Sequence, residues 1–79
     1  MSEMGFNERL GKVLAQRRLE GGHSQEDIGK ILGLTQTQVS RFEQGKQSPR
    51  LDTLRKLADF YRCAMAEIID DAEHFGWTP

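Results

Sequence analysis

Residues 24–46 read SQEDIGKILGLTQTQVSRFEQGK, and this stretch determines the fold that we expect. Ser24 and Thr35 are residue types whose side chains accept a hydrogen bond from the first turn of a helix, so each predicts a helix start. Gly33 predicts the end of the helix that begins after Ser24, because glycine is the residue that most readily closes a helix. The stretch therefore predicts two short helices joined by a turn that is too tight for an antiparallel hairpin of long helices.

Apolar residues in this stretch fall where two crossed helices bury a shared seam. The residues expected in the seam are Ile28, Leu32, Leu34, Val39 and Phe42. Ile31 is expected on the apolar face of the helix between Ser24 and Gly33, together with Ile28 and Leu32. Gly29 lies where a side chain would hold the two helices apart, and Gly33 lies where the turn favours a positive φ.

Outside this stretch the sequence predicts three more helices, which makes the protein all-α with five helices. A first helix is expected from residue 7 to about residue 19, with Asn7 as a cap and Gly21 and Gly22 at its end. Ser48 and Pro49 separate the central pair from a fourth helix over about 51–62. The apolar residues that mark the first and fourth helices are Phe6, Leu10, Val13, Leu14, Leu51, Leu54, Leu57, Ala58 and Tyr61.

The two ends of the chain are expected to add little to this core. Met65, Ile68 and Ile69 predict a short fifth helix, which completes a domain over residues 6–71. Residues 1–5 are expected to be a flexible N-terminus, and residues 72–79 a C-terminal tail without helical periodicity. A chain of 79 residues has surface for one hydrophobic core, so a single compact domain is expected.

Composition and charge narrow the function classes. The net charge is −1, but all 11 basic residues and only six of the 12 acids lie between Arg9 and Arg62, so the middle of the chain is basic and its ends are acidic. No apolar run approaches the roughly 18 residues of a membrane span, and the N-terminus has no basic start or apolar stretch, so a cytoplasmic protein is expected. The spacing of Cys63, His23 and His74 does not suit metal ligands, so no metal or cofactor is expected. No set of residues for nucleophilic or acid–base catalysis can be assembled, so no enzyme activity is expected.

The chain resembles the Cro and phage-repressor class of helix-turn-helix proteins, the XRE family. The resemblance covers roughly residues 6–70. It is carried by Ser24-Gln25-Glu26-Asp27-Ile28-Gly29, Leu32-Gly33-Leu34-Thr35, Val39-Ser40-Arg41-Phe42-Glu43-Gln44-Gly45-Lys46, Ser48-Pro49 and Leu54, Leu57 and Ala58. It implies a compact lambda-repressor-like domain that binds double-stranded DNA and regulates transcription. Gly29 departs from the more usual alanine, which would loosen the helix by up to about 1 kcal/mol, and Trp77 has no counterpart in the family pattern.

The second helix of such a unit enters the major groove of DNA. Because Val39 and Phe42 define its buried side, Thr37, Ser40, Arg41 and Gln44 are expected to project outward. With Gln36 at the leading edge, the residues expected to read bases are Gln36, Thr37, Ser40 and Arg41. Glutamine can pair with adenine and arginine with guanine, and a threonine methyl group can contact thymine.

The resemblance also implies residues that bind the DNA backbone. Gln25 corresponds to a phosphate-binding residue at the start of a helix, where the dipole favours an anion. The full set expected to contact phosphates is Gln25, Gln44, Lys46, Arg50 and Arg17. Arg18 and Glu43 match a family pair that we interpret as a structural ion pair between the first and third helices.

A homodimer is expected, because one helix-turn-helix unit contacts only half of an operator. Its interface is predicted at Met65, Ile68, Ile69 and Trp77, although one of the two isoleucines is expected to complete the monomer core. The alternative function is an antitoxin or adaptor that binds a protein through the same fold, such as a toxin or RNA polymerase. Steep weakening of binding with salt would favour DNA over an apolar protein interface.

Overall fold

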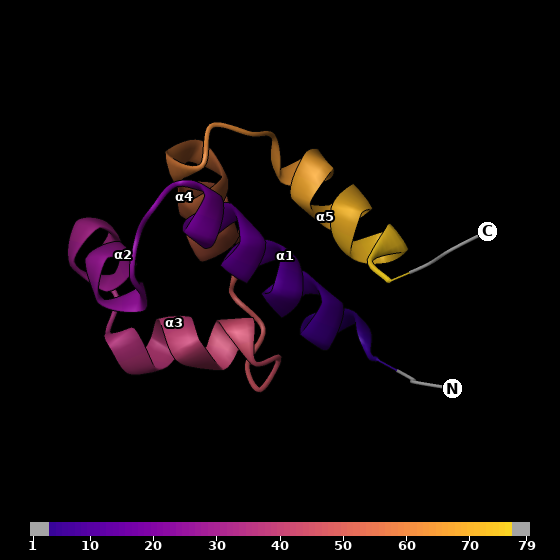
Figure 1. The fold of residues 1–79 in the computed structure, drawn as a ribbon, viewed down its shortest axis with the longest axis horizontal. Helices are drawn as coiled ribbons and strands as arrows, with labels where there is room; N and C mark the ends of the chain where they lie inside the picture. The colour runs from indigo at the N-terminus through magenta and orange to yellow at the C-terminus, as the bar shows by residue number, and fades with distance from the viewer. Residues whose placement is uncertain (1–3, 77–79) are drawn as a thin grey trace.

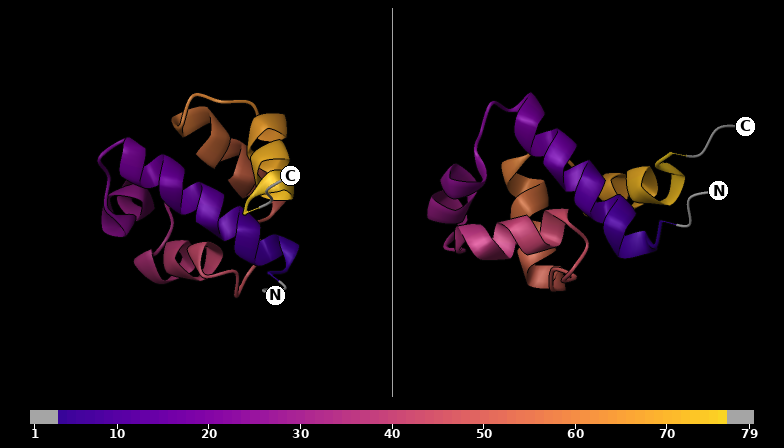
Figure 2. Two further views of the ribbon diagram at one scale, coloured as in Figure 1. Left: turned by 45° about the vertical axis from the view of Figure 1, so that its right-hand side comes forward. Right: turned by 60° about the horizontal axis from the view of Figure 1, so that its bottom comes forward.

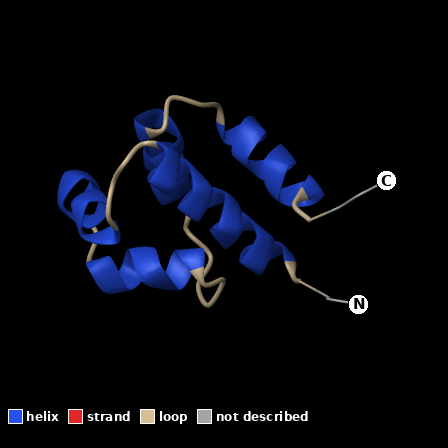
Figure 3. Ribbon diagram, in the orientation of Figure 1, coloured by secondary structure: helices blue, strands red, loops and turns tan. Residues whose placement is uncertain are grey.

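The five expected helices are present in the computed structural model, which describes residues 4–76 (Figure 1). They are α1 (Phe6–Glu20), α2 (Gln25–Leu32), α3 (Gln36–Glu43), α4 (Leu51–Phe60) and α5 (Met65–His74). Within the described residues the remaining chain is loop and turn, and no strand occurs (Figure 3). The predicted all-α fold is therefore confirmed.

The central helix pair begins where the two capping residues predicted. The Ser24 hydroxyl accepts a hydrogen bond from the Asp27 amide at 3.0 Å, and the Asp27 carboxylate accepts one from the Ser24 amide at 3.2 Å. Thr35 and Gln38 form the same reciprocal pair at 3.0 and 2.8 Å. These bonds satisfy amides that the first turn of a helix leaves without partners. Gly33 ends α2 with a φ of 72°, the left-handed conformation that glycine adopts without strain.

Several expected helix ends are wrong by a few residues. The cap of α1 is Gly5 rather than Asn7, which lies inside the helix. The fourth helix ends at Phe60 rather than near residue 62, where Arg62 turns the chain with a φ of 58°. The fifth continues to His74, beyond the residue at which the tail was expected to begin, because Ala72 is fully buried and its position belongs to the helical core.

The core lies between α1 and the helices on either side of it. As the two views of Figure 2 show, α1 runs through the middle of the molecule, and it packs on α3 and on α5. The buried apolar residues are Leu10, Val13, Leu14, Ile28, Val39, Phe42, Leu54, Leu57, Ala58, Ile68 and Ala72. Ile31 was expected on the apolar face of α2, but it is 53% exposed. This expectation is wrong, because one or two turns of helical periodicity do not fix how far the buried stripe extends. Leu51 marks the start of α4 as predicted, although its side chain is 73% exposed.

Two glycines bring the helices closer than side chains would allow. At Gly11 of α1, a Cβ atom would collide with the backbone carbonyl groups of Phe42 and Glu43 at the end of α3. At Gly29 of α2, it would lie 2.6 Å from the carbonyl oxygen of Leu34 in the turn. Gly29, which stands where the family usually has alanine, therefore lies where the turn comes too close for a Cβ atom.

None of the helices in residues 4–76 combines the length and apolar character that crossing a membrane would require.

Candidate nucleic-acid interface

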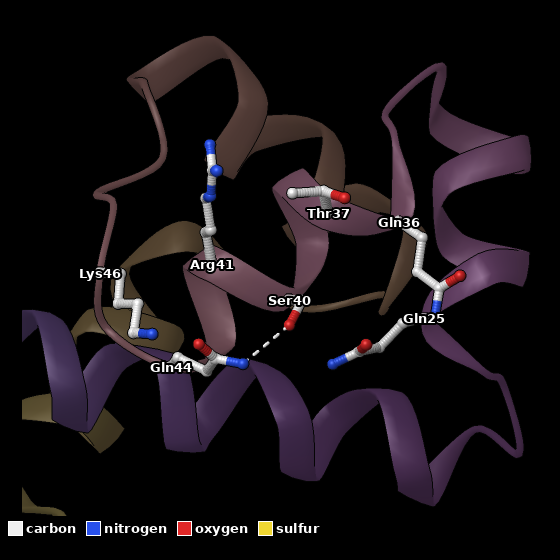
Figure 4. Close-up of a pocket in the computed structure, with 7 residues that line it drawn as sticks. All are labelled: Gln25, Gln36, Thr37, Ser40, Arg41, Gln44 and Lys46. Carbon is white, nitrogen blue, oxygen red and sulfur yellow. Dashed lines mark hydrogen bonds between the residues drawn. The ribbon is translucent and has the colours of Figure 1, made fainter.

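A shallow groove of about 330 Å³ lies along the exposed side of α3 (Figure 4). Its residues come from the start of α2, from α3 and from the loop that follows α3. The lining residues are Gln25, Gln36, Thr37, Ser40, Arg41, Gln44 and Lys46. All four residues expected to read bases lie here, together with three of the five expected to contact phosphates.

The groove faces outward because the opposite side of α3 is fixed in the core. Val39 and Phe42 are buried, which turns Thr37 and Arg41, one helical turn apart, toward solvent. The Arg41 side chain is exposed and makes no hydrogen bond or ion pair with any of residues 4–76. Its guanidinium group is therefore available to a ligand in the groove.

The exposed side chain of Gln44 bonds back to α3. Its side-chain nitrogen donates a hydrogen bond to the Ser40 hydroxyl at 2.9 Å, as the dashed line in Figure 4 shows. Lys46 lies on the same side of the groove, in the loop after α3. Arg50, also expected at a phosphate, precedes α4 and is not among the residues that line the groove.

Arg18 and Glu43 form a bidentate ion pair that joins α1 to the end of α3. Arg18 Nε lies 2.7 Å from Glu43 Oε2, and Arg18 Nη2 lies 3.0 Å from Glu43 Oε1. The two side chains are only 12% and 7% exposed. The hydrogen bonds to Glu43 raise the pKa of Arg18 above its ordinary value, so the guanidinium stays charged.

Two contacts of this pair were not foreseen from the sequence. Arg18 Nη1 donates to the carbonyl oxygen of His23 in the loop between α1 and α2, at 2.9 Å. Gln25 Nε2 donates to Glu43 Oε1, at 3.0 Å. No local sequence signal marks the second contact, because Gln25 and Glu43 are 18 residues apart and meet only when α2 and α3 cross.

Arg17 lies outside the groove. Its guanidinium group donates to the Asp71 carboxylate of α5 at 3.0 Å, and this hydrogen bond raises the pKa of Arg17. The structure thus places Arg17 at the contact between α1 and α5, although a role at a phosphate was expected for it.

The residues expected at a dimer interface do not share one surface. Ile68 is fully buried and offers no surface to a partner, so it is the isoleucine that completes the monomer core rather than an interface residue. Met65 is half-buried and packs against the core, whereas Ile69 is 36% exposed on the outer side of α5. Trp77 lies outside the described residues. Ile69 is therefore the main apolar group that this set presents to solvent.

No cluster of three or more His, Cys, Asp or Glu side chains that could hold a metal ion occurs in residues 4–76. The groove itself contains amide, hydroxyl, guanidinium and ammonium groups. Such groups donate hydrogen bonds to phosphate oxygens and to the acceptor atoms of base edges.

Comparisons with known proteins agree with this geometry. The helix-turn-helix family HTH_3 matches residues 14–68. The CTXphi transcriptional repressor RstR of Vibrio cholerae is 38% identical over 56 residues, which is 71% of this chain and 50% of RstR. The transcriptional regulator PuuR of Escherichia coli is 36% identical over 63 residues, or 80% of this chain and 34% of PuuR. The chain thus spans half the length of the first relative and about a third of the second.

Two solved structures have a similar fold. The clp gene regulator ClgR of Corynebacterium glutamicum superposes with a TM-score of 0.84 at 18% identity, over 91% of this chain and 92% of that chain. The DNA-binding domain of BldD from S. venezulae gives a TM-score of 0.71 at 25% identity, over 80% of this chain and 94% of that chain.

Proposed function

Because this chain belongs to the helix-turn-helix family HTH_3, of the XRE and Cro/C1 type, we propose that it is a cytoplasmic transcription regulator that binds double-stranded DNA as a homodimer. The family is one of DNA-binding regulators rather than enzymes. The observation that carries the proposal is the groove along α3, in which the exposed side of the helix gathers hydrogen-bonding groups.

In this proposal α3 lies in the major groove and its exposed residues read base edges. Arg41 has no partner among the described residues, so it can donate two hydrogen bonds to a guanine. Gln36, at the first turn of α3, is suited to adenine, and the Thr37 methyl group is suited to thymine. Ser40 adds a hydroxyl group between them. Gln25, Gln44 and Lys46 flank this row and contact the phosphates on either side.

The distribution of charge supports the same orientation. The acids of α5, which are Glu67, Asp70, Asp71 and Glu73, lie on a helix that packs against α1 away from α3 (Figure 1). Phosphate groups repel this face, whereas Arg41 and Lys46 attract them at the groove. A net charge near zero is therefore compatible with DNA binding, because the two signs occupy different sides.

The homodimer follows from the size of one reading unit. A single helix-turn-helix unit covers only a half-site, so two copies related by a two-fold axis would read a pseudo-palindromic operator. Ile69 on the outer side of α5 is the apolar residue that we place at the centre of the contact.

The proposal is tested by selecting binding sites from a library of random double-stranded DNA. We expect enrichment of a sequence with two inverted half-sites, protected in footprinting, and a binding constant that falls steeply as the salt concentration rises. Failure to enrich any sequence would contradict the proposal. Enrichment of a single half-site would contradict the dimer alone.

A further inference from the structure

One hydrogen bond in the structure fixes the orientation of a glutamine in the groove. Gln25 is the first residue of α2 and Glu43 is the last residue of α3, so the bond between them joins the outer ends of the two crossed helices. Gln25 Nε2 lies 3.0 Å from Glu43 Oε1. In Figure 4 the Gln25 amide group is turned toward the middle of the groove.

The acceptor in this bond is largely buried and has other hydrogen-bond partners. Both carboxylate oxygens of Glu43 receive hydrogen bonds from Arg18, at 2.7 and 3.0 Å, and the side chain is 7% exposed. Arg18 is held in turn by the carbonyl oxygen of His23. Gln25 therefore faces an acceptor that belongs to a bidentate pair anchored in α1.

A carboxylate accepts hydrogen bonds but donates none, so an amide that faces it must present its nitrogen. That nitrogen carries two hydrogens, and Glu43 uses only one of them. The second remains a donor at the edge of the groove. Without the carboxylate, the oxygen and nitrogen of Gln25 could exchange places, because the two ends of an amide have nearly the same size.

We propose that Glu43 is a positioning residue for DNA binding, which holds the Gln25 amide with its nitrogen toward the DNA so that the second N–H binds a backbone phosphate. This inference rests on the proposed function. The start of α2 favours the same ligand, because the positive end of the helix dipole attracts an anion. Arg18 neutralises the charge of Glu43, so the carboxylate can orient the amide without repelling the phosphate.

A double-mutant cycle on DNA affinity tests this role. Gln25→Ala, Glu43→Gln and the double variant are compared on the operator recovered by the selection, at a temperature where circular dichroism shows each to be folded. We expect each single change to weaken binding about tenfold, the effect of losing one hydrogen bond to a charged group. We expect the double variant to bind about as weakly as Gln25→Ala, because Glu43 acts through Gln25.

Losses that multiply to about a hundredfold would overturn the inference, because a purely structural Glu43 would weaken binding equally with or without Gln25. Gln16→Ala is the control for Gln25, since Gln16 is exposed on α1 outside the groove. Asp71→Asn is the control for Glu43, since it weakens an ion pair between α1 and α5. Neither control is expected to change affinity more than twofold. Failure of the wild-type protein to select an operator would contradict the proposed function itself.

A second measurement uses the wild-type protein, so it does not depend on the stability of any variant. The side-chain amide of Gln25 is followed by nitrogen-15 NMR with and without operator DNA. We expect one of its two protons to be shifted by hydrogen bonding in the free protein, and the other to shift when DNA is added. If the chemical shift of the second proton stayed at its solvent-exposed value in the complex, the inference would be overturned.

Discussion

Arg41 is the residue whose side chain is most clearly available for base recognition. We expect Arg41→Ala to leave the fold intact, because the side chain is exposed and has no partner among the described residues. Binding to the selected operator should weaken by about 1–3 kcal/mol, and a mismatch at the contacted base pair should no longer lower the affinity of the variant. Footprinting with matched and mismatched operators measures both effects. Arg55→Ala on the exposed face of α4 is the control, and equal behaviour of the two variants would exclude Arg41 from readout.

The pair of Arg18 and Glu43 gives a prediction for stability rather than affinity. We expect Arg18→Ala and Glu43→Ala each to lower the free energy of unfolding by roughly 2–4 kcal/mol, because each leaves a largely buried charge without its partner. The double variant should lose far less than the sum of the two. Urea unfolding of the four proteins measures this coupling, and additive losses would show that the two side chains do not stabilise each other.

Individual side-chain roles were predictable only where the sequence pattern specifies a side of a helix. Thr37, Ser40 and Arg41 line the groove as expected, because buried Val39 and Phe42 fix the rotation of α3. Such a pattern does not reveal contacts between elements that are distant in sequence. The bond from Gln25 to Glu43 and the use of Arg17 at α5 depend on how helices cross, and neither could be inferred beforehand.

At the scale of elements, the crossing of α1 and α3 depends on Gly11. Alanine is about 1 kcal/mol better than glycine inside a helix, so propensity alone predicts that Gly11→Ala stabilises the protein. We expect the opposite, a loss of about 2 kcal/mol or more, because the new Cβ collides with backbone carbonyl groups of α3 that cannot rotate away. Thermal and urea unfolding measure the change.

The matched control for Gly11 is Gly5→Ala, where the nearest atom to a new Cβ, Glu8 Oε1, is 3.9 Å away. A loss of no more than about 1 kcal/mol is expected there, because Gly5 is the N-cap of α1, where glycine is better than alanine. If Gly11→Ala were as stable as this control, the close crossing would not matter to the fold.

The starts of α2 and α3 were predictable because capping is local, whereas the start of α1, the end of α5 and the close crossing at Gly11 were not. Ser24 and Thr35 bond to residues three positions ahead, which a sequence shows directly. The continuation of α5 to His74 depends instead on burial of Ala72, and alanine by itself does not distinguish a core position from a tail. The close approach at Gly29 was predicted, whereas its contact with the carbonyl oxygen of Leu34 depends on the path of the turn.

At the scale of the whole molecule, the proposed homodimer is tested through Ile69. We expect the wild-type protein to associate at micromolar concentrations and Ile69→Asp to be a folded monomer, because a charge on the outer side of α5 opposes pairing. Sedimentation equilibrium with circular dichroism measures both states. Ile31→Asp is the control, since Ile31 is an exposed apolar residue on α2. A wild-type protein that stays monomeric at tens of micromolar, or an Ile69→Asp protein that unfolds, would contradict the interface.

The arrangement of α5 against α1 has a consequence for how the protein is made. Helix α1 supplies Leu10 and Val13 to the core, and α5, which follows it much later in the chain, supplies the fully buried Ile68 and Ala72. A nascent chain that still has α5 inside the ribosome therefore leaves part of α1 exposed to solvent. The domain therefore cannot complete its core until α5 has left the ribosome, and until then the chain remains open to chaperones and proteases.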